Sequence, residues 1–210
     1  MTTRRCLFVI PMILIVANCA HVGSPTAATD PVASEGASAM PSFVWHDGER
    51  EHWVWMNPGL VAELGPSPQG AARLSQATVL ADSNAGSEHI RYWKMDRGMT
   101  SEQALQQLAR EPASGRYSPV LHDAPNGDGP IRLLPGNVVV VLDPGWTKDA
   151  VGQWIARRKL RVVSELPFAP NMLLLHTEAG LPALELANTL HRSGEVKAAF
   201  PDWLAQKVVK

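Results

Sequence analysis

The chain has 210 residues, and its 19 Lys and Arg against 20 Asp and Glu give a formal net charge of −1 at neutral pH. This balance, without a long basic stretch, argues against a nucleic-acid-binding protein. Both cysteines, Cys6 and Cys19, stand near the N-terminus, so the sequence predicts a folded region without disulfides or thiol chemistry.

Residues 1–19 have the pattern of a secretory leader. Two arginines precede an apolar run over residues 7–17, which is too short to anchor the chain across a bilayer. The run leads into VANC (16–19), which resembles a bacterial lipobox and makes Cys19 the candidate lipidation site. Cleavage after Ala28 by ordinary signal peptidase is the alternative. Both routes predict an exported protein, located in the periplasm, in the outer membrane as a lipoprotein, or in the medium, which meets a membrane only through its lipid.

The rest of the chain is predicted to be a tether and two folded domains. Residues 20–42 are rich in Ser, Ala, Pro, Gly and Thr, which is typical of a flexible linker. The segment NGDGP (126–130) has turn chemistry and marks the junction between the domains. The domains are therefore expected over 43–125 and 130–210.

The first domain contains three predicted strands and one predicted helix. The strands are expected over 57–67, 89–95 and 116–123, and the helix over 101–109. Trp53 and Trp55 stand two residues apart, so in a strand both indoles lie on one face. Packing on the helices of this domain is the simpler interpretation, and a binding platform is the alternative.

The second domain has the order strand, helix, strand, strand, helix, strand. The predicted elements are a strand over 131–142, a helix over 148–159, strands over 160–166 and 172–177, a helix over 181–192, and a strand over 196–200. The four valines at 138–141 are typical of a buried strand. Thr147 stands where a helix N-cap belongs, Trp154 falls on the core side of the helix, and Gly194 is a helix stop. This order predicts an α+β, ferredoxin-like βαββαβ fold.

The first domain repeats this plan more weakly. NPGLVAELGPS (57–67) parallels LPGNVVVVLDPG (134–145), and SEQALQQLA (101–109) parallels PALELANTL (182–190). Self-similarity with a period of about 80 residues predicts two tandem copies of the ferredoxin-like unit.

The second domain resembles the N-terminal propeptide of secreted bacterial subtilases. The resemblance is carried by a strand, PG and a capped helix within 134–168, and by LxLANxL, a Gly-Glu-Val step and a closing PxW within 171–203. It covers about 130–205 well and 43–123 faintly. The chain ends at Lys210 without the catalytic motifs of a subtilase, so we expect a free-standing propeptide-like protein that acts in trans.

The resemblance implies a binding function and no enzymatic activity. Subtilase propeptides pack their sheet on the catalytic domain, lay their C-terminal tail through the active-site cleft, assist folding and inhibit until they are cleaved. A subtilisin-like serine protease is therefore the expected partner, and the tail is expected to add to its cleft as a strand. The partner-binding tail consists of Trp203, Leu204, Ala205, Gln206, Lys207, Val208, Val209 and Lys210. Trp203 has a second interpretation, as an anchor against its own domain.

No metal site, cofactor or catalytic group is predicted. The seven histidines form neither an H-E-x-x-H pair nor a close cluster with cysteine. The His-Asp pairs at 46–47 and 122–123 lack a nucleophile elbow and are typical of turns after strands. Two further interpretations remain open: a non-catalytic envelope lipoprotein that binds or scaffolds something else, and a remnant of a split subtilase gene. The sequence leaves open the identity of the protease and the choice between inhibition and assisted folding.

Overall fold

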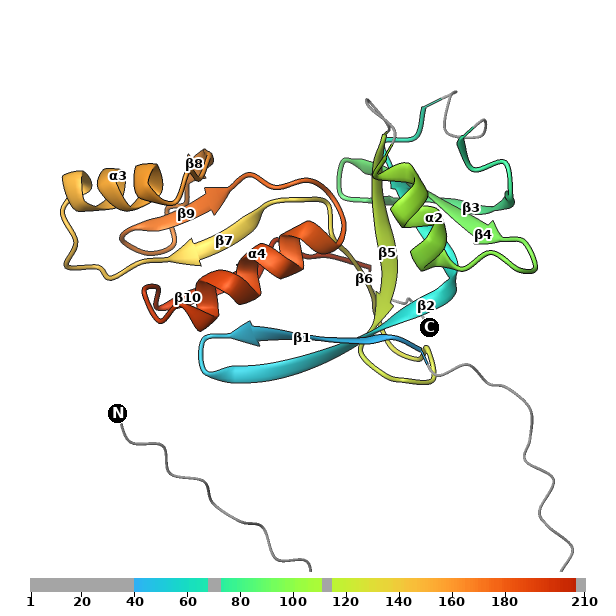
Figure 1. Ribbon diagram of the computed structural model, residues 1–210, viewed down its shortest axis with the longest axis horizontal. Coiled ribbons are helices and arrows are strands. Elements are labelled where there is room, and N and C mark those ends of the chain that lie inside the picture. Colours follow the sequence, from blue (N-terminus) through green and yellow to red (C-terminus); the bar gives the residue numbers. More distant parts are fainter. Residues whose placement is uncertain (1–39, 68–72, 111–114, 207–210) are drawn as a thin grey trace, which may run out of the picture. The chain divides into compact units, whose positions relative to one another are not determined.

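The computed structural model describes residues 40–67, 73–110 and 115–206, all within one compact unit (Figure 1). The leader with Cys19, most of the tether and residues 207–210 lie outside the described residues. The fold is α+β, as expected, with antiparallel sheets and three described helices. No helix in the described part of the chain is long and apolar enough to cross a membrane.

The larger sheet comes mainly from the first half of the chain. Its strands are β1 (Ser42–Asp47), β2 (Arg50–Leu64), β3 (Ala77–Ala85), β4 (Glu88–Met95), β5 (Arg116–His122), β6 (Ile131–Leu133) and β11 (Leu204–Gln206). The strand order is β11-β6-β5-β2-β4-β3, and β1 pairs with the first part of β2. The end strands β3 and β11 also contact each other, so the sheet curls. One of its cores consists of Ala62, Leu64, Ile90, Tyr92, Val120 and Leu133.

Helix α2 (Ser101–Leu108) lies against β2 and β5, and it is the helix expected over 101–109. A capping box starts it: the Thr100 hydroxyl accepts from the backbone N–H of Gln103, whose side chain accepts from the N–H of Thr100. The Ser101 hydroxyl donates to the Asn57 carbonyl over 2.8 Å. The cap therefore fixes both the start of the helix and its position on the sheet.

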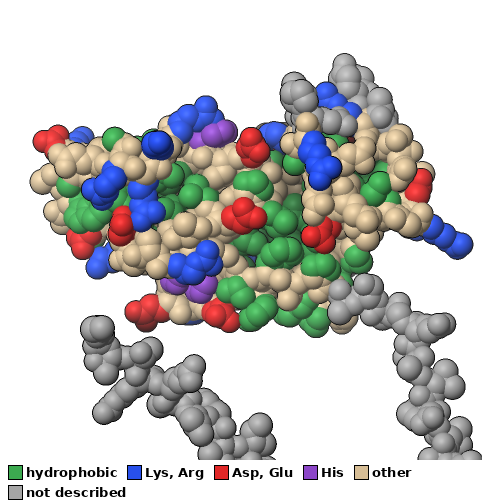
Figure 2. All heavy atoms as spheres, in the orientation of Figure 1, with side chains coloured by type: hydrophobic (Ala, Val, Ile, Leu, Met, Phe, Trp, Pro, Cys, Tyr) green, Lys and Arg blue, Asp and Glu red, His purple; other side chains and the backbone are tan. Residues whose placement is uncertain are grey.

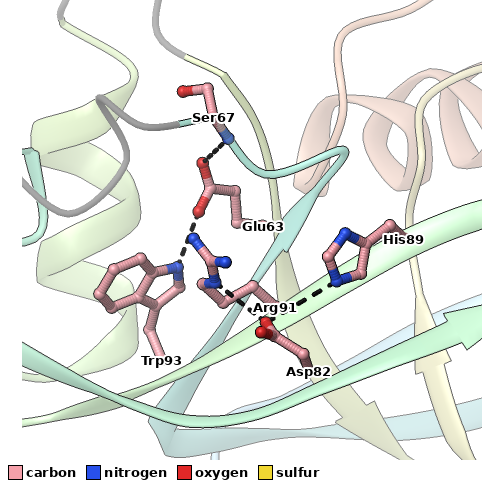
Figure 3. A network of polar contacts seen from close by, with 6 residues as sticks. All are labelled: Glu63, Ser67, Asp82, His89, Arg91 and Trp93. Atoms are coloured by element: carbon pink, nitrogen blue, oxygen red, sulfur yellow. Dashed lines mark hydrogen bonds and ion pairs between the residues drawn. The ribbon is translucent and has the colours of Figure 1, made fainter.

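A buried carboxylate, Glu63, lies on the larger sheet and is 1% exposed. Its two oxygens accept from the indole Nε1–H of Trp93, over 3.0 Å, and from the backbone N–H of Ser67, over 3.2 Å (Figure 3). Burial of a carboxylate is tolerated only when such donors replace the lost water. The Trp93 bond therefore holds the end of β2 against β4, and the Ser67 bond fixes the segment that follows β2.

Replacing Trp93 with phenylalanine should lower the free energy of unfolding by about 1–3 kcal/mol, because one oxygen of Glu63 then stays buried without its donor. Chemical denaturation measures the change. The double variant Trp93→Phe with Glu63→Leu should regain part of the loss, because the buried carboxylate is then gone too. A single variant as stable as the original protein would show that the Trp93 indole contributes no net hydrogen-bond energy.

The smaller sheet comes from the second half of the chain. Its elements are β7 (Val138–Val141), α3 (Lys148–Arg157), β8 (Val162–Glu165), β9 (Met172–Leu175), α4 (Leu181–Arg192) and β10 (Ala198–Pro201). The strands lie in the order β10-β7-β9-β8, with every neighbouring pair antiparallel. Both helices expected here are confirmed, and the hydroxyl of Thr147 caps α3 as predicted by accepting from the N–H of Ala150.

The single strand expected over 131–142 is wrong, because the structure has two strands there. β6 belongs to the larger sheet and β7 to the smaller one. Pro135 between them has no N–H to donate to a ladder. Gly136 and Asn137 both have positive φ, at 99° and 70°, which turns the chain between the sheets. A Cβ on Gly136 would also lie 2.9 Å from the Thr177 carbonyl oxygen, so glycine is required by the close approach as well.

The two halves of the chain share a core. Trp45, Val54 and Met56 of the first half belong to the same buried cluster as Val140 and Leu184 of the second. Strand β11 returns to pair with β6, next to β5. The division into domains at 125–130 and the duplication of a ferredoxin-like unit stay predictions.

Histidines connect the β1–β2 hairpin to helix α4. The imidazole rings of His46 and His191 stack with their centroids 3.9 Å apart. The side-chain amide of Asn188 donates to the Val44 carbonyl over 2.7 Å. Burial, then the neighbouring His46, then Arg192 hold the pKa of His191 below its usual value. The neutral form of His191 is therefore the one that fits this contact.

Stability should fall as the pH drops below the ordinary histidine pKa of about 6.5. A folded-state pKa below the unfolded value means that the unfolded chain binds the proton more readily, so this contribution is complete at higher pH and is lost on acidification. His122, whose pKa is lowered by burial, acts in the same direction. Denaturation between about pH 7.5 and about pH 5.5 should show this slope. His191→Asn should flatten it and His176→Asn, at an exposed position, should not; equal slopes in both variants would contradict the assignment.

Candidate binding site

The smaller sheet packs its two helices on one face only. Every second residue of β7, β9 and β10 joins the core cluster with α3 and α4, namely Val138, Val140, Leu173, Leu175 and Ala199. Side chains alternate between the two faces of a strand, so the residues in between point to the opposite face. We call that opposite face the open face, and it consists of Val139, Val141, Met172, Leu174, Ala198 and Phe200. Figure 1 shows α4 over β7 and β10 on the packed face.

The open face is an apolar surface two rows deep. The register places Phe200, Val139 and Leu174 side by side across three strands, and Ala198, Val141 and Met172 form the next row. Val139 in the central strand is 7% exposed, and the other five side chains are partly exposed. Phe200 also packs against the core cluster, so only part of its ring is available to a partner. None of these six carries a charge, which is unusual for a surface of contiguous side chains.

Two more apolar side chains are exposed at the β8–β9 end of the sheet. Val163 is the extra residue at an irregularity in β8 and is 52% exposed, while Phe168 in the following turn is 80% exposed. A phenylalanine so open to water is a poor contributor to its own fold and a good anchor for a partner. The exposed apolar surface of the second half of the chain therefore includes the turn between β8 and β9.

The sequence-predicted tail begins inside the fold. Trp203 packs on the shared core, with its ring 5.4 Å from that of Trp45 in an edge-on arrangement. Leu204 packs on the core of the larger sheet, and Ala205 pairs with Arg132. Trp203 thus anchors against its own chain, which was one of its two expected roles. Lys207, Val208, Val209 and Lys210 lie outside the described residues.

The other candidates from the sequence fall in three places. Trp154 is a core residue, 1% exposed, as expected. Trp53 is 48% exposed and Trp55 is partly exposed, and both line a cleft of the larger sheet. The described residues contain no group of three or more His, Cys, Asp or Glu that could hold a metal ion.

Comparison with family models, curated proteins and solved structures gives no match. The resemblance to subtilase propeptides stays a prediction.

Sequence reasoning expected sheet-face packing from the resemblance but named none of the open-face residues, although they lie in the strands with the clearest apolar pattern. The runs VVVV and MLLL are apolar at every position, which predicts strands that are buried on both faces. Two helices in a βαββαβ order cover only one face of a sheet. That combination was the available signal: the second apolar face has to be covered by something that the expected elements do not supply.

Proposed function

We propose that this chain is an exported, propeptide-like protein that binds a subtilisin-like serine protease in trans through the open face and inhibits it. The open face supports this function most directly. An apolar sheet surface opposite the helices is what a propeptide presents to its protease, and burying it is the favourable step.

The strand order of the smaller sheet supports a ferredoxin-like unit over 138–201. β7 and β8 run in the same direction with β9 between them, and β9 and β10 do so with β7 between them. These are two interleaved βαβ crossovers, the split arrangement of the ferredoxin-like fold. In it both helices lie on one face, so no described helix covers the other face, which we assign to docking.

Apolar contact is expected to dominate the affinity. Each Å² of apolar surface removed from water contributes about 25 cal/mol, and association entropy offsets part of the sum. Acidic and basic side chains are interspersed on the face shown in Figure 2. The six side chains of the open face are uncharged, so they offer a charged partner no group of opposite sign. Specificity is therefore assigned to shape, with Phe200 and Leu174 as central anchors and Phe168 at the rim.

The segment that enters the protease cleft is limited to the residues after Gln206. Leu204–Gln206 already pair with β6, so a strand added to the protease would begin at Lys207. Four extended residues span at most about 14 Å, enough for a few specificity subsites. In such a strand successive side chains point to opposite sides, so the sequence KVVK would present one Lys and one Val on each side. The leader over 1–19 is expected to deliver the protein to the same compartment as a secreted protease.

The test is calorimetric titration of a secreted subtilisin-like protease from the same cell, with its serine nucleophile blocked, against the protein. We expect saturable binding at a one-to-one ratio. Deleting 207–210 should leave binding to the blocked enzyme and reduce inhibition of the active one, because β11 stays intact. Because apolar burial gives a heat that changes strongly with temperature, the titration is run at two temperatures, and absence of heat at both at about 100 µM would refute the proposal and leave a scaffold with a different partner.

A further inference from the structure

A cleft on the larger sheet lies beside the exposed part of β2 and has a volume of about 350 Å³. Aromatic side chains dominate its lining, with Trp45, His52, Trp53 and Trp55 from the β1–β2 hairpin. Asp123 and Arg132 close one end. The volume lies within the range of small-ligand sites. None of these residues belongs to the open face.

The cleft contains a strand edge that no described strand pairs with. On one side of β2, β1 pairs with residues 50–55. On the other side, β5 reaches only Trp55 and Met56, and no strand among the described residues pairs with Glu51–Val54 there. The N–H of Met56 donates to the Pro41 carbonyl on the β1 side. Backbone groups alternate between the two sides of an antiparallel strand, so the N–H and C=O of Trp53 and of Glu51 point into the cleft.

Aromatic rings stand on both sides of that edge. The imidazole of His52 stacks on Trp45 with centroids 4.4 Å apart, on one face of the hairpin. Trp53 lies on the other face and is 48% exposed, and its Nε1–H donates to a carboxylate oxygen of Glu51 over 3.0 Å. That bond restrains the indole, while about half of the side chain stays open to water. An exposed tryptophan held in one orientation is a prepared contact surface.

The charges favour a basic ligand. Arg132 is paired with Asp123, and its guanidinium lies 5.8 Å from the ring centres of both Trp45 and Trp203. Glu51 makes no ion pair with a described residue, and its exposed carboxylate accepts from the ring N–H of Trp53, so it stands at the edge of the indole. A cation over that indole would gain the attraction of the ring and of the carboxylate together.

We propose that this cleft binds an extended, basic peptide segment, which adds as a strand to β2 at Glu51–Val54 and places a Lys or Arg side chain over Trp53. The peptide backbone bonds to the free N–H and C=O groups of Trp53 and Glu51. A saccharide would also stack on tryptophan, but it would use neither the strand edge nor the Glu51 carboxylate. The site is independent of protease inhibition.

The experiment titrates the full chain with the acetylated and amidated peptide Val-Lys-Val-Lys-Val and follows tryptophan fluorescence and heat. We expect saturable binding with a Kd below about 1 mM. The same peptide N-methylated at alternate residues should bind at least about tenfold more weakly, because it cannot donate to the strand edge. Trp53→Ala and Glu51→Gln should each weaken binding, and Leu80→Ala, at an exposed position of β3, should not.

Three outcomes would overturn this assignment. They are equal binding of the N-methylated peptide, unchanged binding by Trp53→Ala, and no saturation by the peptide at about 1 mM. Chitotetraose is titrated in parallel, and saturation by it but not by the peptide would make the cleft a saccharide site instead. Circular dichroism and unfolding midpoints of the variants separate loss of the site from loss of the fold.

Discussion

Replacing Leu174 with aspartate should abolish binding to the protease and leave the protein folded. Leu174 lies in β9, between Val139 and Ser164 in the register, and its side chain points away from the core cluster. In the free protein the new carboxylate reaches water. In the complex it would be buried without a partner, which costs several kcal/mol, or about 100-fold or more in affinity.

Calorimetry with the blocked protease measures this loss, and thermal unfolding verifies the fold. Val79→Asp is the matched control, because Val79 is a strand valine of the larger sheet and is 52% exposed. It should bind like the unchanged protein. Undiminished binding by Leu174→Asp, at an unchanged unfolding midpoint, would show that the open face is not the contact surface.

Replacing Trp154 with alanine should cause the largest loss of stability, about 3–5 kcal/mol. Trp154 is 1% exposed in the core under α3, and its Nε1–H donates to a carboxylate oxygen of Glu195 over 2.8 Å. The substitution removes the ring and leaves a cavity, because the surrounding helices and strands relax only partly to fill it. It also ends a bond that helps to hold the pKa of Glu195 down, after the larger effect of Arg158.

Denaturant unfolding measures the loss in free energy of unfolding. Trp53→Ala is the control, because the Trp53 indole is about half exposed and its removal should lower the free energy of unfolding far less. Trp154→Ala should leave binding at the open face and at the cleft unchanged, because Trp154 faces neither of them. A loss below about 1 kcal/mol would contradict a close-packed core at this position.

The sequence was informative where local chemistry decides structure. Thr147 caps α3 as predicted, and the helical register of Trp154 placed it in the core. The α+β class followed from the same alternation of strands and helices. The strand at 131–142 was misjudged because periodicity does not show that Pro135 and Gly136 send its two halves to different sheets.

The two candidate sites depend on contacts between distant residues. For Trp53 and Trp55 a platform was the alternative to packing on the helices of their domain, but Arg132 joins the cleft only because β6 pairs with β5. Likewise, the early part of the tail pairs with β6, which a terminal sequence does not reveal. The predicted βαββαβ order places both helices on one side of the sheet, but the six open-face residues depend on the register of β7, β9 and β10. Pairing over many residues is set by the whole fold and not by local pattern.

The most direct test of the central claim is an inhibition titration of the active subtilisin-like protease, with a chromogenic peptide as substrate. The account predicts that activity falls linearly with added protein and reaches its minimum at a one-to-one ratio, while Leu174→Asp leaves the protease active. Full protease activity in the presence of about a tenfold excess of the folded protein over an enzyme concentration near 1 µM would contradict it.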